Sequence, residues 1–468
     1  MKPVLTVQDM RAVDARALHA VAEETLVERA GTAVASWAVR MLGGTYGRRV
    51  VVVAGKGNNG ADGRVAADRL RRRGARVTVV EASDAPESIG PAGAVHLVID
   101  AAYGTGFRGE YRAPAVPPGV PVLAVDIPSG VDGDTGAACG EPLRADVTVT
   151  FAALKPGLLQ GDGAALAGRV EVADIGLDTG DARMWLVDDT DVARLLAPRP
   201  RDAHKWQSAV AVVAGSPGMT GAAGLCARAA YRAGAGMVRL GVPGASGTEL
   251  PVSEAVGAAL PARGWAPEAL AMAERCKAVV VGPGLGRADG TGTEVRAVVG
   301  DAPVPVVVDA DGLYALGEGD ELRAALAPGP ASSGAAGRAL RVLTPHDGEF
   351  ARLAGAAPGP DRVAAAAGLA VRCGAAVLLK GPTTVVAHPG GDVLLAATGS
   401  PRLATAGTGD VLSGVIGAFV ARGVVPHVAA ALAAHVHGRA ADLGVPEGLV
   451  AGDLAELVAR WLSGIRRG

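Results

Sequence analysis

The chain has 468 residues, which exceeds the size at which a single hydrophobic core usually stops growing, so two domains are expected. Its 45 basic and 47 acidic side chains give a formal net charge of -2, which argues against the strongly basic surface of a nucleic-acid-binding protein. No apolar run is long enough for a membrane span, and the acidic residues near the start are unlike a signal peptide, so we expect a cytoplasmic enzyme without nucleic-acid or membrane partners.

Strands and helices alternate in the first part of the chain. A capping-box pattern at Thr6 opens a predicted helix, and residues 49–54 (RVVVVA) form a short apolar run typical of a strand buried on both faces. A helix is predicted at residues 60–73, and further strands at 76–80, 95–100, 121–126 and 146–151. This order predicts a doubly wound α/β domain whose ligands lie at the carboxyl ends of its strands.

The alternation breaks between residues 178 and 201, where an acidic patch and a proline–arginine run indicate a domain junction. We place the boundary near residue 184, which gives domains of residues 1–184 and 185–468. Strands are predicted again at residues 209–214, 237–242, 278–281, 304–309, 341–344 and 376–380. The second domain is therefore also expected to be α/β, with a mainly parallel sheet flanked by helices.

Three polar motifs follow predicted strands of the first domain. The turn at residues 55–63 (GKGNNGADG) lies before a helix, where backbone N–H groups can hold a phosphate. Side-chain oxygens of Asn59, Asp100 and Ser129 form an all-oxygen set suited to a hard cation. Taken singly, Asp100 and Asp126 are also explained as turn or cap residues.

Together the GKGNNG turn, the GTGFRG loop after Asp100 and the DIPSG element at Asp126 resemble the NAD(P)H-hydrate epimerase family. The resemblance implies a Rossmann-like fold and a nicotinamide cofactor hydrated at C6 as the substrate. It implies potassium at Asn59, Asp100 and Ser129, and makes Asp126 the acid/base residue that moves a proton at C6. It places the substrate against Asp126 and against two loops, which contain Asn58, Asn59, Gly60, Ala61, Asp62, Gly104, Thr105, Gly106, Phe107, Arg108, Gly109 and Glu110.

Two positions of the turn depart from the family pattern. The family usually has glycine where Ala61 stands and an aliphatic residue where Arg64 stands. Because alanine adopts a positive φ less readily than glycine, the sequence leaves the geometry of this turn open.

The second domain carries its own motifs at predicted strand ends. GSPGMTGAA follows the strand at 209–214, GPGLG the strand at 278–281, and TPHDGE and KGPTT follow two later strands. The turn at residues 407–410 (GTGD) runs into an apolar helix at 411–420, where free N–H groups and the helix dipole favour an anion. On their own, His346 could be a solvated side chain, Lys380 part of a strand-end turn, and Asp410 an N-cap.

This order of motifs resembles the ribokinase-like superfamily, and HK at 204–205, TPHDGE, KGPTT and LATAGTGD resemble its NAD(P)H-hydrate dehydratase branch. The whole chain thereby resembles the bifunctional NAD(P)H-hydrate repair enzymes. The resemblance implies ADP or ATP with magnesium as co-substrate, NADHX and NADPHX as substrates, and Asp410 as the base that activates a substrate hydroxyl. It places the hydrate at Ala222, Gly284, His346 and Asp410, and the nucleotide at Lys380, Gly381, Pro382, Thr383, Thr384 and Gly409.

Two alternatives remain open from the sequence. A GTGD turn also suits a kinase of a small alcohol such as a hydroxymethylpyrimidine or a thiazole, which would leave a stable phosphate ester. The first domain could instead be a binding module with a degenerate site. The sequence does not choose between ADP and ATP or between the two hydrated cofactors, and we expect a homo-oligomer.

Overall fold

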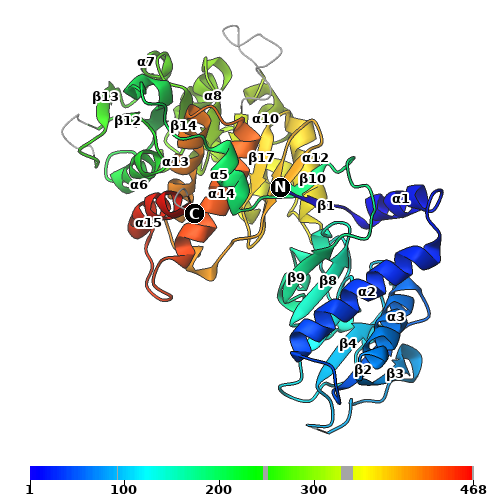
Figure 1. Ribbon diagram of the computed structural model, residues 1–468. Helices are drawn as coiled ribbons and strands as arrows, with labels where there is room; N and C mark the ends of the chain where they lie inside the picture. The colour runs from blue at the N-terminus through cyan, green and yellow to red at the C-terminus, as the bar shows by residue number, and fades with distance from the viewer. Residues whose placement is uncertain (92, 246–250, 328–340, 466–468) are drawn as a thin grey trace. The chain divides into compact units, whose positions relative to one another are not determined.

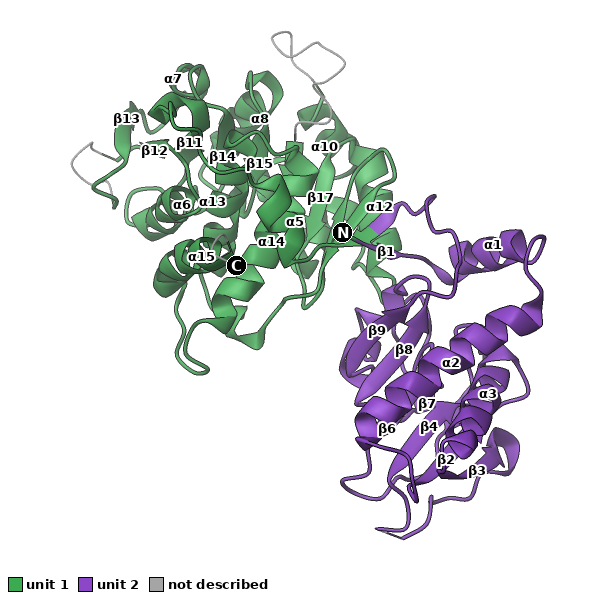
Figure 2. Cartoon of the chain, in the orientation of Figure 1, with its two compact units in different colours: residues 1, 185–468 green, residues 2–184 purple. Residues whose placement is uncertain are grey.

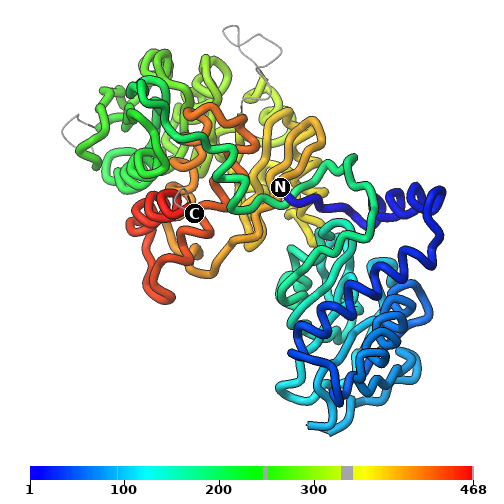
Figure 3. The backbone as a smooth tube through the Cα atoms, in the orientation of Figure 1, coloured from blue at the N-terminus to red at the C-terminus, as the bar shows by residue number. Residues whose placement is uncertain are grey.

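The computed structural model describes residues 1–91, 93–245, 251–327 and 341–465. The chain divides into two compact units, one of Lys2–Met184 and one of Trp185–Gly468 together with Met1 (Figure 1, Figure 2). The backbone tube passes through the first unit before it enters the second, so apart from Met1 each unit is built from one continuous segment (Figure 3).

The first unit is a parallel sheet covered by helices. Its strands run in the order β3-β2-β4-β6-β8-β9, and every neighbouring pair is parallel. Their bounds are β2 Arg49–Ala54, β3 Arg76–Glu81, β4 Leu97–Ala101, β6 Val122–Val125, β8 Val147–Phe151 and β9 Arg169–Ala173. The helices are α1 Val7–Ala17, α2 Glu23–Leu42, α3 Asn58–Arg72 and the short α4 Gly163–Leu166, and β5 Tyr111–Arg112 pairs with β7 Gly140–Glu141.

The apolar run of β2 explains how this sheet is buried on both faces. Val50 and Val52 pack with α2 and α3, whereas Val53 belongs to the apolar cluster that contains Val98 and Tyr111. Because successive side chains of a strand point to opposite faces, an uninterrupted run of valines serves both layers. The sheet therefore holds the carboxyl ends of β2, β4 and β6 at one edge, where the polar motifs begin.

The second unit is a larger mixed sheet, in which strands follow the order β10-β19-β18-β17-β16-β15-β14-β11-β12-β13. The pairs from β17 to β13 are parallel, and β17-β18 and β18-β19 are antiparallel. The bounds are β10 Met184–Leu186, β11 Ala209–Val213, β12 Met237–Pro243, β13 Val256–Leu260, β14 Ala278–Val281, β15 Val306–Val308, β16 Arg341–Leu343, β17 Ala376–Leu379, β18 Thr384–Ala387 and β19 Val393–Ala396.

One helix of this unit, α13 (Thr408–Ala421), is buried almost all round, which agrees with its uniformly apolar sequence. It packs with α6 (Thr220–Arg232), α14 (Pro426–Asp442) and α15 (Ala451–Ile465) in one large core. The remaining helices are α5 Asp189–Leu195, α7 Ala266–Ala273, α8 Thr291–Asp301, α9 Asp311–Ala315, α10 Gly319–Ala325, α11 Asp347–Ala354 and α12 Arg362–Cys373.

The prediction of an α/β chain with mainly parallel sheets flanked by helices is confirmed. Among the described residues, no helix is both long and apolar enough to span a bilayer.

Candidate active sites

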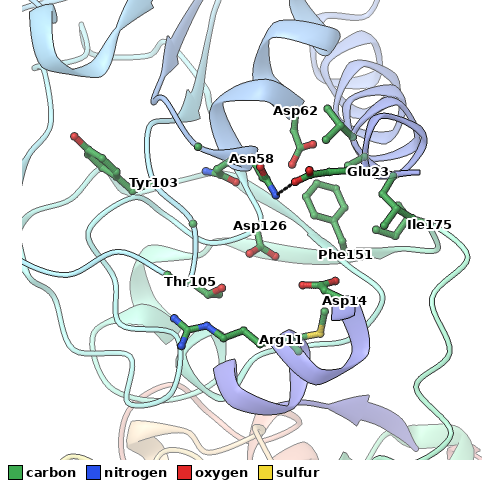
Figure 4. A pocket seen from close by; sticks show the side chains of 18 of the residues that line it. Arg11, Asp14, Glu23, Asn58, Asp62, Tyr103, Thr105, Asp126, Phe151 and Ile175 are labelled. Carbon is green, nitrogen blue, oxygen red and sulfur yellow. Dashed lines mark hydrogen bonds between the residues drawn. The ribbon is translucent and has the colours of Figure 1, made fainter. Parts of the chain in front are cut away.

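A cavity of about 490 Å³ opens at the carboxyl edge of the first unit's sheet (Figure 4). Its wall includes Asn58, Asn59 and Asp62 from the turn after β2, and Asp126 from the end of β6. The loop after β4 contributes Gly104, Thr105, Gly106 and Phe107. Most of the positions that the sequence assigned to the epimerase substrate therefore share one cavity, whereas five of them lie outside its lining: Gly60, Ala61, Arg108, Gly109 and Glu110.

The turn after β2 is shaped by close backbone contacts. A Cβ atom at Gly55 would lie 1.9 Å from the Ala102 carbonyl oxygen, and one at Gly60 would lie 1.8 Å from the Gly55 carbonyl oxygen. No side chain fits in either place. These two glycines let the start of α3 pack directly on the loop that follows β4.

This contact predicts the effect of Gly60→Ala. We expect the variant to displace the start of α3, to lower the melting temperature of the first unit and to remove C6 epimerisation, because the new methyl group would overlap the Gly55 carbonyl. Thermal melting and an assay of single-epimer conversion measure these losses. Gly57→Ala is the matched control for stability, since Gly57 has a negative φ and no atom within 4 Å of its Cβ position, although it lines the cavity; an equal fall in melting temperature in both variants would contradict this account.

The two departures from the family pattern have structural explanations. Ala61 lies in the first turn of α3 and its N–H donates to the Gly57 carbonyl, so this position does not need a positive φ. Arg64 donates one hydrogen bond to the Gly55 carbonyl at 2.8 Å and another to Glu81 at 2.7 Å. Arg64 thus links the turn to the end of β3. The turn geometry that the sequence left open is that of an ordinary helix start.

Asp126 has a backbone conformation that residues other than glycine rarely adopt. Its φ is 65°, in the left-handed region, and its carboxylate Oδ1 accepts hydrogen bonds from Lys155 Nζ at 2.6 Å and from Thr150 Oγ1 at 3.0 Å. The Lys155 side chain is only 2% exposed and also donates to Thr150 Oγ1 and to the Phe151 carbonyl. A strained backbone and a buried ion pair at one cavity wall are typical of a catalytic group.

Two further carboxyl groups point into the same cavity, those of Asp62 and Asp14 (Figure 4). Burial and the neighbouring charge of Asp126 raise the pKa of Asp62 to about 8. Burial also raises the pKa of Asp14, with Lys155 opposing and Asp126 adding to the shift. Repulsion between nearby carboxylates favours a proton on some of them near neutral pH.

Of the residues proposed for a cation, Asn59 lines this cavity, and Asp100 and Ser129 lie outside its lining. Asp100 is fully buried, and its carboxylate accepts hydrogen bonds from the Ser129 N–H at 2.9 Å and the Ser129 hydroxyl at 2.6 Å. Burial raises the pKa of Asp100, and no lysine or arginine of the described chain forms an ion pair with it. The Asn59 amide packs near Gly104, and its Nδ2 is buried without a hydrogen-bond partner.

In the second unit, Asp309 and Lys380 form a central ion pair at the ends of β15 and β17. Lys380 Nζ lies 2.6 Å from Asp309 Oδ1, and the Ser413 hydroxyl of α13 donates to Asp309 Oδ2 at 2.7 Å. A Cβ atom at Gly409 would lie 3.3 Å from Lys380 Nζ, so glycine keeps the lysine close to the helix start. Two strands and α13 are thereby tied together beneath the GTGD turn.

Asp410 lies beside this pair in the first turn of α13. Burial raises its pKa to about 6, the charges of Asp309 and Asp311 add to this shift, and Lys380 opposes it. A carboxyl group with a pKa near neutrality can both accept and return a proton under working conditions.

The start of α13 presents an anion site. Gly407 has a φ of 88°, and among the described residues the N–H groups of Gly409 and Asp410 have no backbone acceptor. His437 is buried, burial lowers its pKa to about 4, and its Nε2 lies 2.9 Å from the Thr408 carbonyl. The neutral ring therefore donates to that carbonyl and holds the turn, while the free N–H groups and the helix dipole attract negative charge.

The loops assigned to the hydrate meet one another. A Cβ atom at Gly284 would lie 2.9 Å from the Ala222 Cβ, so the two predicted positions are in contact. Asp311 accepts from the Gly286 N–H at 2.9 Å and from Arg287, which fixes the GPGLG loop to the end of β15. Small residues on both loops leave space beside the backbone.

His346 has a structural role that the sequence did not predict. It is the N-cap of α11, and its Nδ1 accepts from the Gly348 N–H at 3.0 Å, while the Glu349 side chain accepts from the His346 N–H. The side chain is 61% exposed, which leaves Nε2 on the surface. Its capping role is therefore observed, and its contact with a substrate stays a prediction.

The KGPTT segment is an ordered strand end. Arg362 donates to the Lys380 carbonyl at 2.6 Å, and the Gly399 N–H donates to the Pro382 carbonyl. Thr384 begins β18, and Thr383 is buried. The turn is thus rigid enough to position a ligand.

Comparison with known proteins identifies both units. Residues 210–462 match the family described as NAD(P)H-hydrate dehydratase, and residues 23–89 and 80–157 match the family described as YjeF-related protein N-terminus. The chain is 41% identical to a bifunctional NAD(P)H-hydrate repair enzyme of Mycobacterium tuberculosis, an alignment that covers 92% of each chain. The chain belongs to the bifunctional NAD(P)H-hydrate repair enzymes. The relative from Salinibacter ruber is 39% identical over 98% of this chain and 96% of its own.

The fold of the second unit also has a solved counterpart. A ribokinase-like superfamily protein of Enterococcus faecalis superposes with a TM-score of 0.51 at 19% identity, and covers 61% of this chain and 97% of that one. This superposition confirms the predicted ribokinase-like fold of the second unit of this NAD(P)H-hydrate repair enzyme.

Sequence reasoning did not assign several side chains that line these two sites. Lys155, Asp14 and Arg11 line the first cavity, and Ser413 is bonded to Asp309 in the second unit. One signal was available for Lys155, because lysine is rare in this chain and Lys155 follows a buried strand by four residues. Asp14 and Ser413 lie within helices far along the sequence from their partners, so no local motif marks them.

Proposed function

We propose that this chain repairs hydrated NADH and NADPH in two steps. Residues 1–184 interconvert the R and S hydrates at C6, and residues 185–468 dehydrate the S hydrate back to the reduced cofactor with ADP or ATP, releasing phosphate. The observation that supports this division is that each unit holds one carboxyl group in a special environment: Asp126 lines the cavity and is paired with Lys155, and burial raises the pKa of Asp410. The epimerase unit is needed because the dehydratase accepts one epimer only.

In the first unit, the substrate occupies the cavity between the turn at residues 58–62 and the loop at 104–110, with Asp126 at C6. The free end of the Asp126 carboxylate moves the proton that inversion requires. Arg108 and Glu110 are outside the observed lining, so we assign them to the parts of the cofactor that extend from the cavity.

Potassium fits the buried residues Asp100 and Ser129 together with Asn59 of the cavity wall. Asp100 is a fully buried carboxylate without a cationic partner in the described chain, and the buried Asn59 amide can turn over to present its oxygen. Asn59, Asp100 and Ser129 would hold the ion, which supplies the positive charge that neutralises Asp100.

The potassium proposal has a direct test. Replacing potassium with lithium or tetramethylammonium is expected to lower the epimerisation rate and the melting temperature of the first unit, because Asp100 would then be buried without compensation. Dehydration of the pure S hydrate serves as the internal control. Unchanged epimerisation in potassium-free buffer would refute the site.

In the second unit, Asp410 takes the proton of the C6 hydroxyl as this oxygen attacks the terminal phosphoryl group of ADP or ATP. The free N–H groups of Gly409 and Asp410, the helix dipole and Lys380 stabilise the negative charge that develops. Elimination of phosphate then restores the double bond. Ala222, Gly284 and His346 contact the hydrate, and the segment from Lys380 to Thr384 with Gly409 contacts the nucleotide.

Magnesium would arrive with the nucleotide. Asp309 is already neutralised by Lys380, and Asp311 by Arg287 and the Gly286 N–H. Phosphate oxygens and water are therefore the main ligands that the ion would keep.

The pH dependence of dehydration follows from the raised pKa of Asp410. The base must be ionised, and half of it is protonated near pH 6. We expect the dehydration rate to fall about tenfold for each unit of pH below this value, and to level off above it. The measurement is the rate with saturating S hydrate and nucleotide across this range; a flat acidic limb down to pH 4 would contradict the assignment.

The function as a whole is tested with mixed hydrate epimers and ADP or ATP. Consumption of both epimers with return of the reduced nicotinamide absorbance supports both activities. A persisting phosphate ester would instead indicate a small-alcohol kinase, and consumption of one epimer only would indicate a non-catalytic first unit. The cytoplasmic location and the homo-oligomeric state stay predictions of the sequence.

A further inference from the structure

Two of the carboxyl groups in the cavity of the first unit, those of Asp126 and Asp62, differ in their hydrogen-bond partners. Asp126 Oδ1 accepts both nearby donors, Lys155 Nζ and Thr150 Oγ1, while its Oδ2 has no hydrogen-bond partner among the described residues. Asp62 is only 7% exposed, and its carboxyl group makes no hydrogen bond or ion pair within the described chain. Both side chains are directed into the same space (Figure 4).

These surroundings separate the charge states of the two groups. The buried ammonium of Lys155 compensates a negative charge on Asp126. Asp62 has no such partner, and burial together with the Asp126 charge raises its pKa to about 8, so it carries a proton at neutral pH. Two carboxyl groups in environments of this kind can serve one as base and the other as acid.

The next step rests on the proposed function. C6 of the hydrated nicotinamide ring carries the hydroxyl group and is also bonded to the ring nitrogen N1. Such a carbon can invert in two ways: it loses hydroxide and later takes up water on the other face, or it breaks the bond to N1 and closes it again. The first route exchanges the oxygen atom, and the second keeps it.

We propose that the first unit inverts C6 by opening the ring, with Asp126 as the base for the hydroxyl and Asp62 as the acid for N1. The hydroxyl proton passes to Asp126 Oδ2, the C6–O bond becomes a carbonyl, and the electron pair of the C6–N1 bond goes to N1. N1 takes the proton of Asp62. The product is an open-chain aldehyde, and no water, oxidant or reductant is consumed.

Closure is the same step in reverse. The aldehyde turns about the C5–C6 bond, the N1 electron pair attacks the opposite face of C6, N1 returns its proton to Asp62, and Asp126 returns the other proton to the oxygen. The observed pair of groups matches this route because it needs an ionised base and a neutral acid at two different atoms. Loss of hydroxide would instead need a proton donor at the oxygen, a role that Asp126, paired with Lys155, does not suit.

The decisive measurement follows the oxygen atom. A purified single epimer is incubated with the full-length protein, without ADP or ATP, in water enriched in the heavy oxygen isotope, and the other epimer is analysed by mass spectrometry. After subtraction of the spontaneous reaction, retention of the original oxygen in most inverted molecules supports ring opening. One solvent oxygen in every inverted molecule overturns it.

Variants test the role of Asp62 separately. Asp62→Asn is expected to lower the inversion rate about 100-fold or more, since the amide cannot supply the proton. Asp68→Asn is the matched control on the same helix, because Asp68 is exposed and pairs only with Arg71. An Asp62→Asn variant that melts like the parent and inverts C6 at the parent rate overturns the proposal.

The outcome is distinct from failure of the proposed function. If the parent protein does not invert C6 above the spontaneous rate, the epimerase function itself is wrong. If the parent inverts C6 but the label or Asp62→Asn gives the contrary result, only the ring-opening route is wrong.

Discussion

Asp410→Asn is expected to lower the rate of dehydration by roughly 10²- to 10⁴-fold, the contribution typical of a positioned general base. Asparagine keeps the size of the side chain and its contacts at the start of α13, but it cannot accept the C6 hydroxyl proton. The Lys380–Asp309 pair and the free N–H groups of the turn remain in place, so nucleotide binding should persist. The measurement compares single-turnover dehydration of pure S hydrate with nucleotide affinity.

The control for this variant tests the alternative that Asp410 only stabilises the start of α13 through its charge. Asp453 is the acidic residue in the first turn of α15, as Asp410 is in the first turn of α13. Asp453→Asn removes a favourable charge from a helix start and should cost about 0.3–1 kcal/mol without affecting the chemistry. If Asp410→Asn loses only stability, as Asp453→Asn does, Asp410 only stabilises the helix start and is not the base; epimerisation should persist in both variants.

The elements that the sequence predicted well are those whose signal is local. The predicted strand at residues 49–54 has the observed bounds of β2. A short run of valines that ends in glycines is typical of a strand buried on both faces of a parallel sheet. The strand ends at Asp100 and Asp126 followed from the same rule, and they fixed the edge of the sheet where the first cavity lies.

The missed elements have weaker local signals. The long helix α2 is an exception, since Leu26, Ala30, Val34, Ala38 and Leu42 form a regular buried stripe that its sequence already carries. Strands β18 and β19 form an antiparallel hairpin that departs from the parallel pattern. Strand β13 contains Gly257 and two alanines, which have low strand propensity, and it is held at the sheet edge by its pairing with β12. Tertiary pairing decides such segments.

The residues of the two candidate sites also fall into those with a local sequence signal and those without one. Turn motifs gave the residues that need special backbone geometry, such as Gly60 and Gly407. Partners brought together by folding were not accessible, because Asp309 and Lys380 are 71 positions apart and Lys155 meets Asp126 across 29. Those partners set the charge states, so protonation could be assigned only from the structure.

Asp126→Asn is expected to remove C6 epimerisation while dehydration of the pure S hydrate continues. Asparagine is a sharper probe than alanine here for two reasons. It tolerates the left-handed conformation observed at φ 65° better than alanine, and its side-chain oxygen can still accept a hydrogen bond from Lys155. Asp126→Ala would leave the buried ammonium with two neutral hydrogen-bond acceptors but no carboxylate, at a cost of about 3–5 kcal/mol.

The two substitutions therefore differ in stability more than in chemistry. Both should remove epimerisation and both should lower the melting temperature of the first unit, because each leaves the Lys155 charge without a carboxylate; Asp126→Ala should lower it further, since it also removes the hydrogen-bond acceptor, and adding Lys155→Met should restore part of the loss in either variant because the unpaired charge is gone. Conversion of a single epimer, corrected for the spontaneous rate, is the measurement for each variant. An Asp126→Asn protein that still clears both epimers at the parent rate would show that the carboxylate is structural, and that the base must be sought among the other carboxyl groups of the cavity, Asp14, Glu23 and Asp62.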